Sequence, residues 1–107
     1  MDALLHNTLL FDFYGDLLTE KQKNIYHMYH CEDLSLAEIG SRLNISRQAV
    51  NFSIKQAQRS FLAFEEVLGL VEQHIAAQNH VGALRQALEN KDYVAGNKIL
   101  TELSKLV

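Results

Sequence analysis

Proline and tryptophan are absent from this chain of 107 residues, and glycine occurs only five times. Because proline and glycine are the strongest breakers of regular structure, long uninterrupted helices are permitted. Runs of β-branched residues, which favour strands, are also lacking. The composition therefore predicts an all-α fold, and the length suits one domain with a helical extension.

The sequence also lacks the marks of an exported or membrane-bound chain. No apolar run approaches the roughly 20 residues that span a bilayer. The N-terminus has no basic stretch followed by an apolar one, so a secretory signal is not expected. The single cysteine, Cys31, has no partner for an internal disulfide, which suits a reducing compartment. We expect a cytoplasmic protein with no membrane insertion.

Groups that carry chemistry are scarce. His27, His30 and Cys31 form the one cluster of metal-ligand types, and nothing in the sequence supplies the third or fourth ligand that a zinc site needs. The alternative for these side chains is partial burial on a supporting helix. A glycine-rich loop that would cradle phosphate is missing too. We therefore expect no metal, no cofactor and no enzymatic activity.

What is present is a helix-turn-helix pattern in the segment LSLAEIGSRLNISRQAVNFSIKQAQR, residues 34–59. Ser35 and Glu38 form a capping box that begins one helix near residue 35. Asn44 tolerates the left-handed backbone that ends a helix, and Ser46 is an N-cap for the next helix, from residue 47 onward. Gly40, in the middle of the first helix, predicts a close crossing there. Two helices joined by a short turn with a small residue at the crossing are typical of this motif.

The second helix of the motif has one basic, polar face. The chain has a net charge of −3, yet residues 42–59 contain four cations and no carboxylate. Such a local basic stretch on an acidic protein is expected of a phosphate contact, although a solvated helix face is an equal alternative. Phe52 lies on the same face, where it can contact a base or pack against a partner chain. The candidate nucleic-acid-binding residues are Arg42, Ser46, Arg47, Gln48, Asn51, Phe52, Lys55 and Arg59.

Helices are also predicted on both sides of the motif. Residues 3–15 and 19–30 suit two supporting helices, the second begun by a capping box at Thr19 with Ile25, Met28 and Tyr29 facing inward. Residues 79–107 suit a helical hairpin turning at residues 90–92, with Asp92 as an N-cap. We predict a helix-turn-helix domain over residues 1–64 and a helical extension over 65–107.

An apolar repeat with alternating spacings of four and three runs on from the motif and predicts a single helix over about residues 47–78. The part beyond the motif would leave a stripe of large apolar side chains in need of a partner. We expect that stripe to make a homodimer, so that the extension is a dimerisation segment. Gly69 is a weak point of the long helix, although it lies off the stripe, and the alternative is a monomer in which the chain after Gly69 folds back as a separate helix. The predicted interface residues are Phe64, Leu68, Val71 and Ile75.

Three strings, LLFDFYGDLLTEKQ (9–22), EDLSLAEIG (32–40) and ISRQAV (45–50), together resemble the YlxM-like family of small bacterial helix-turn-helix proteins. The middle of the chain is also similar to the fourth, DNA-binding region of bacterial sigma factors. The resemblance implies a sigma-region-four-like helix-turn-helix fold and, because genes of the family neighbour those of the signal recognition particle, a regulatory role connected with that pathway. This chain departs from the family at Asn51, where an aromatic residue is usual, and at Phe52, where a polar one is.

Two functions follow from these features. The first is a regulator that binds duplex DNA through the second helix of the motif. The second is an accessory of the signal recognition particle that binds its protein or its RNA and keeps the motif as a scaffold, since a fold does not fix a function.

Overall fold

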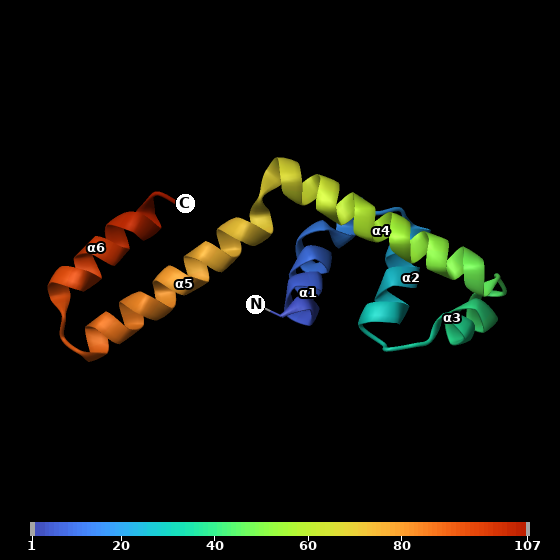
Figure 1. The fold of residues 1–107 in the computed structure, drawn as a ribbon, viewed down its shortest axis with the longest axis horizontal. Coiled ribbons are helices and arrows are strands. Elements are labelled where there is room, and N and C mark those ends of the chain that lie inside the picture. The colour runs from blue at the N-terminus through green and yellow to red at the C-terminus, as the bar shows by residue number, and fades with distance from the viewer. Residues whose placement is uncertain (1, 107) are drawn as a thin grey trace. The chain divides into compact units, whose positions relative to one another are not determined.

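The fold of the protein was obtained as a computed structural model that describes residues 2–106 (Figure 1). These residues form α-helices and one short 3₁₀ turn, with no strand among them, so the predicted all-α class is confirmed. The elements are α1 (Ala3–Tyr14), η1 (Gly15–Leu17), α2 (Glu20–His30), α3 (Leu36–Leu43), α4 (Arg47–Leu68), α5 (Leu70–Glu89) and α6 (Tyr93–Ser104). Within residues 2–106 none of these helices has the length and apolar character needed to cross a bilayer.

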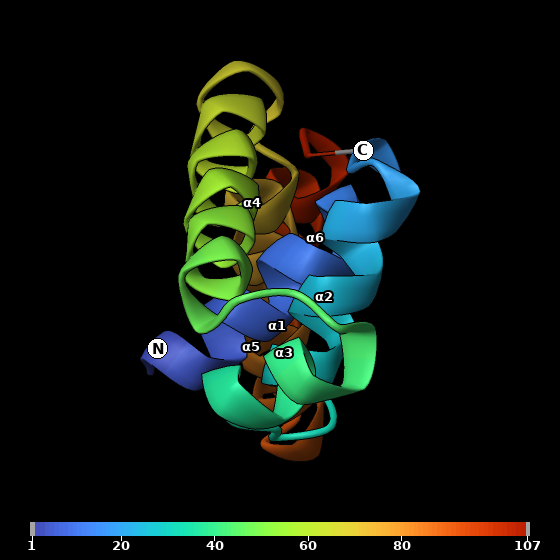
Figure 2. The same ribbon diagram turned by 90° about the vertical axis from the view of Figure 1, so that its right-hand side faces the viewer.

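The chain divides into two compact units, Met1–Leu68 and Gly69–Val107. In the first unit α1, α2 and α3 lie on the same side of α4, as both views show (Figures 1 and 2). Helix α4 is therefore the element against which the other three pack. The second unit is a hairpin of α5 and α6.

The core of the first unit is rich in aromatic side chains. Tyr26 is only 1 % exposed, and its ring centroid lies 5.1 Å from that of Phe61 in an edge-to-face arrangement. Phe11 adds a contact to Tyr26 at 5.2 Å. The prediction that Tyr29 faces inward was wrong, because Tyr29 is 40 % exposed. Ile25 and Met28 are buried as predicted, and the buried tyrosine of this helix is Tyr26.

Four helix starts are fixed by side chains that the sequence identifies. Thr19 and Ser35 each form a complete capping box, with Gln22 and Glu38 respectively. The Oγ of Ser46 accepts a hydrogen bond from the backbone N–H of Ala49 at 3.0 Å. Asp92 likewise accepts from the N–H of Ala95 at 3.1 Å and starts α6. These caps satisfy backbone donors that a helix terminus leaves free.

The predicted single helix over residues 47–78 is wrong, because the helix is interrupted at Gly69. This residue has φ +61°, in the left-handed region, and it separates the end of α4 at Leu68 from the start of α5 at Leu70. The apolar repeat therefore does not form one stripe along one helix. Phe64 and Leu68 belong to α4, and Val71 and Ile75 belong to α5.

The hairpin of the second unit turns at residues 90–92, as predicted, with Lys91 at φ +56°. Gly96 of α6 is buried, and a Cβ there would lie 3.6 Å from Cδ1 of Leu84, so α5 and α6 approach closely. Val107, assigned to the apolar face of the last helix, lies outside the described residues.

Candidate nucleic-acid interface

The turn between α3 and α4 sets the geometry of the motif. Asn44 ends α3 in the left-handed conformation, with φ 57° and ψ 45°. The N–H of Ile45 then donates to the carbonyl of Gly40 at 2.9 Å, which closes the end of α3. The next residue, Ser46, caps α4. The turn thus uses Asn44 and Ser46 as predicted from the sequence. The helices α3 and α4 begin and end where they were predicted around this turn.

Gly40 lies where the turn presses against α3. A Cβ built on Gly40 would lie 2.7 Å from the carbonyl oxygen of Ile45, closer than real Cβ atoms come to other atoms. It would also lie 3.5 Å from the backbone N of Arg47, the first residue of α4. Gly40 therefore lies at a close approach, but its tightest contact is with the turn and not with α4, so the predicted crossing of the two helices at Gly40 stays a prediction.

Helix α4 has a buried face and an exposed face. Val50, Ile54, Ala57 and Phe61 are buried against the other helices of the unit. The opposite face is exposed, and four of the candidate residues lie on it: Gln48, Phe52, Lys55 and Arg59. Phe52 is 61 % exposed, an unusual degree for a large aromatic side chain.

The cations of this region differ in their surroundings. Arg42, in the last turn of α3, lies 3.7 Å from Glu32. Within residues 2–106 the side chains of Arg47, Lys55 and Arg59 form no ion pair. Arg47 and Arg59 are twelve residues apart, which is about 18 Å along an α-helix. These three cations are therefore available to an anionic partner.

A hollow of about 310 Å³ lies at the start of α4, lined by Leu36, Arg47, Gln48 and Asn51. Three of these side chains were predicted from the sequence, and the structure brings them together. Leu36 was missed, because its apolar character and its place in the first turn of α3 indicated only a core position. Ser46 lies beside them, but its hydroxyl already caps α4. The hollow thus combines hydrogen-bonding amides, one guanidinium and one apolar wall.

The histidines and the cysteine of α2 and its C-terminal end serve other contacts. Nδ1 of His27 lies 3.2 Å from a carboxylate oxygen of Glu32, and Nε2 of His30 lies 2.9 Å from the hydroxyl of Thr8. Burial raises the pKa of the Cys31 thiol, helped by the nearby carboxylates of Asp12 and Glu32. In the described part of the chain no three His, Cys, Asp or Glu side chains gather as a metal site would require.

A capped two-helix motif packed on two supporting helices defines a helix-turn-helix protein. The sequence matches, over residues 1–101, the UPF0122 family described as "Putative helix-turn-helix protein, YlxM / p13 like". The chain belongs to this family, and the predicted resemblance is confirmed.

Curated relatives agree with this assignment. A UPF0122 protein of Thermoanaerobacter sp. (strain X514) is 47 % identical over 82 % of this chain and 75 % of its own length. One from Symbiobacterium thermophilum is 40 % identical over 89 % of each chain. One from Shouchella clausii is 36 % identical over 99 % of this chain and 98 % of its own, so the similarity includes the helical extension.

Proposed function

We propose that this protein is a non-catalytic, cytoplasmic regulator that binds duplex DNA through the first half of α4. The observation that carries the proposal is the exposed face of α4, with unpaired cations at Arg47, Lys55 and Arg59 and no carboxylate between residues 42 and 59. The N-terminal part of the second motif helix is the part that other helix-turn-helix proteins place in the major groove.

In this arrangement the side chains divide by role. The amides of Gln48 and Asn51 suit the edge of adenine, which offers an acceptor and a donor side by side. Arg47, Lys55 and Arg59 suit phosphates, which fix position on the duplex without reading sequence. Arg42, at the end of α3, can contact a phosphate if it exchanges its ion pair with Glu32 for one with the phosphate.

The salt dependence of binding tests this proposal. Affinity supplied by phosphate contacts falls with salt in proportion to the number of contacts. A double change of Lys55 and Arg59 to alanine should weaken duplex binding and flatten the slope of log K against log salt by about 2. The measurement is fluorescence anisotropy over a salt series with a pool of duplexes of mixed sequence.

A matched control is available in the second unit. Arg85 and Lys98 are exposed cations of the same two types, so changing both to alanine alters the net charge equally. That control should leave the slope unchanged. No binding of the parent protein to any duplex at low salt would reject the proposal.

The exposure of Phe52 favours a second candidate, an accessory of the signal recognition particle that binds its protein or RNA. A large aromatic side chain in water suits an unpaired base or an apolar partner surface better than a phosphate-lined groove. Here Phe52→Ala should weaken capture of the partner in a pull-down scored for RNA and protein, while duplex affinity stays unchanged. Equal capture by the parent and the variant would reject this candidate.

We also propose that the protein is a homodimer, although not through one continuous stripe. Of the predicted interface, Leu68 is 52 % exposed, Ile75 is half-buried, and Val71 is buried. Phe64 packs on Tyr14, with ring centroids 5.9 Å apart. The hairpin exposes four further large apolar side chains, Leu88, Tyr93, Val94 and Leu100, each at least half exposed.

A further inference from the structure

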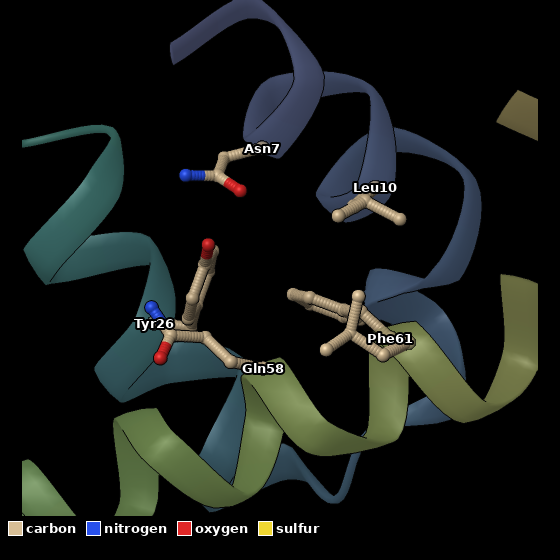
Figure 3. A pocket seen from close by; sticks show the side chains of 6 residues that line it. Asn7, Leu10, Tyr26, Gln58 and Phe61 are labelled. Carbon is tan, nitrogen blue, oxygen red and sulfur yellow. The ribbon is translucent and has the colours of Figure 1, made fainter. Parts of the chain in front are cut away.

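Two hollows of the first unit differ in what they offer to a ligand. One lies between α1, α2 and α4 and measures about 220 Å³, and Figure 3 shows Leu10, Tyr26 and Phe61 around it. The rings of Tyr26 and Phe61 are each 1 % exposed, so they belong to the packed core and present no face to a ligand. The other is the hollow at the start of α4, which we call the α4 hollow. It is lined by Leu36, Arg47, Gln48 and Asn51.

The polar side chains of the α4 hollow are uncommitted. Within residues 2–106 the guanidinium of Arg47 forms no ion pair, and the amides of Gln48 and Asn51 form no hydrogen bond. Arg47 and Gln48 are exposed, and Asn51 is partly buried. The hollow therefore offers two free amides and one free cation to a partner.

Leu36 forms the apolar wall of the α4 hollow. It is the first residue of α3 and is only partly buried, so the core does not enclose its whole side chain. The polar groups of the same turn are occupied, because the Ser35 hydroxyl accepts from the Glu38 N–H and the Glu38 carboxylate accepts from the Ser35 N–H. The first turn of α3 thus contributes an apolar surface beside the two amides.

An adenine–thymine pair presents the matching groups in the major groove of DNA. Adenine offers an acceptor at N7 and a donor at N6, which suit an asparagine or glutamine amide, and thymine offers an apolar 5-methyl group. That methyl group projects toward the backbone of its own strand, and the first helix of a helix-turn-helix motif crosses the backbone at the edge of the groove. Guanine–cytosine pairs have no such methyl group.

We propose that Leu36 contacts the 5-methyl group of a thymine, while the amides of Gln48 and Asn51 hydrogen-bond to adenine in the same stretch of duplex. This inference rests on the proposed DNA contact and names the bases that the α4 hollow selects. It also distinguishes DNA from RNA, because uracil lacks the methyl group and the major groove of an RNA duplex is too deep and narrow for side chains to reach the bases.

The test begins with the selection of tightly bound duplexes from a random library by the parent protein. Adenine–thymine pairs should be enriched at a fixed position of the selected site. Deoxyuridine then replaces each thymine of that site in turn, which removes one methyl group and leaves the base pairing unchanged. At one of these thymines the replacement should weaken binding about fourfold, the effect of one methyl group no longer buried. Fluorescence anisotropy measures the ratio of the two affinities.

The same ratio is then measured for Leu36→Ala, in which it should fall close to one. A folding defect does not imitate this result, because both duplexes are bound by the same preparation and any unfolded fraction cancels from the ratio. Leu43→Ala is the matched control. Leu43 is the other partly buried leucine of α3 and does not line the α4 hollow, so this variant should keep the fourfold ratio.

The outcomes separate this inference from the DNA contact on which it rests. A selected site without thymine, or a ratio of one at every thymine, would overturn the inference and leave the DNA contact standing. A fourfold ratio that persists in Leu36→Ala would also overturn it and assign the methyl contact to another residue, such as Phe52. Equal binding of the selected sequence as duplex RNA would overturn it as well. Failure of the parent to bind any duplex would instead reject the DNA contact, and the inference with it.

Discussion

Gly40 carries a steric constraint that is confined to one residue. It lies in the middle of α3, where glycine is unfavourable by about 1 kcal/mol relative to alanine. The contact of its missing Cβ with the carbonyl of Ile45 at 2.7 Å outweighs that cost, because backbone atoms of a tight turn cannot move aside cheaply. The glycine predicted a close approach at this position, and the structure identifies the nearest atom as the carbonyl oxygen of Ile45.

We predict that Gly40→Ala lowers the free energy of unfolding by about 1–3 kcal/mol, and Gly40→Leu by at least as much, through overpacking. Gly82 is the matched control: it lies in a helix with no atom within 4 Å of a built Cβ. Gly82→Ala should therefore stabilise by about 0.5–1 kcal/mol. Urea denaturation followed by circular dichroism measures both, and a Gly40→Ala variant as stable as the parent would contradict the close approach.

Tyr26 and Tyr29 show where inference from single residues fails. Both lie on α2, three positions apart, and the apolar periodicity of that helix did not distinguish them. Which of the two tyrosines is buried depends on Phe11 of α1 and Phe61 of α4, whose rings contact the ring of Tyr26. Contacts between helices that are distant in sequence leave no local pattern, so the burial of Tyr26 could not be predicted from α2 alone.

At the scale of the element, helix starts were predicted well because each cap is a local hydrogen bond. The box at Ser35 is also titratable. Hydrogen bonds from the backbone N–H and the hydroxyl of Ser35 hold the pKa of Glu38 below its ordinary value of 4.5. A carboxyl group whose pKa is lower in the folded state stabilises the fold above its unfolded pKa, and this stabilisation disappears as the pH falls through the folded pKa.

We therefore predict that Glu38→Gln is less stable than the parent at pH 6 and that this difference shrinks between pH 4.5 and pH 3. Thermal unfolding over that pH range measures the difference. Glu89, an exposed carboxylate at the end of α5, supplies the control in Glu89→Gln. A difference for Glu38→Gln that stays constant down to pH 3 would mean that the box gains nothing from the charge of Glu38.

The start of α5 after Gly69, in contrast, was not predicted from the sequence. The spacing of apolar residues continues through this position, so periodicity alone indicated one helix. Glycine adopts the left-handed region at little cost, and it is the residue that commonly follows the end of a helix. Gly69 lies off the apolar stripe, so the repeat of apolar residues is unaffected by the end of α4 at this position.

At the scale of the whole molecule, charge and apolar surface are distributed unevenly. The chain has a net charge of −3, yet residues 42–59 contain four cations and no carboxylate, and α6 exposes the apolar side chains of Tyr93, Val94 and Leu100. The basic surface could be predicted from the sequence because three of its four cations lie on one helix, α4. The apolar surface depends on which face of α6 turns toward α5, which the hairpin packing decides.

Val94 and Leu100, 84 % and 50 % exposed, make this surface the place to test dimerisation. Burying a large aliphatic side chain contributes about 1.5–3 kcal/mol, so several such residues together can hold two chains at micromolar concentration. We predict that the parent protein sediments as a dimer at equilibrium and that Leu100→Glu shifts it to the monomer, because a carboxylate at the contact is desolvated without a partner. Lys21→Glu, at an exposed position of α2 in the first unit, should remain dimeric although it alters the charge more. A monomer mass for the parent across the whole concentration range would show that α6 leaves this apolar surface in water.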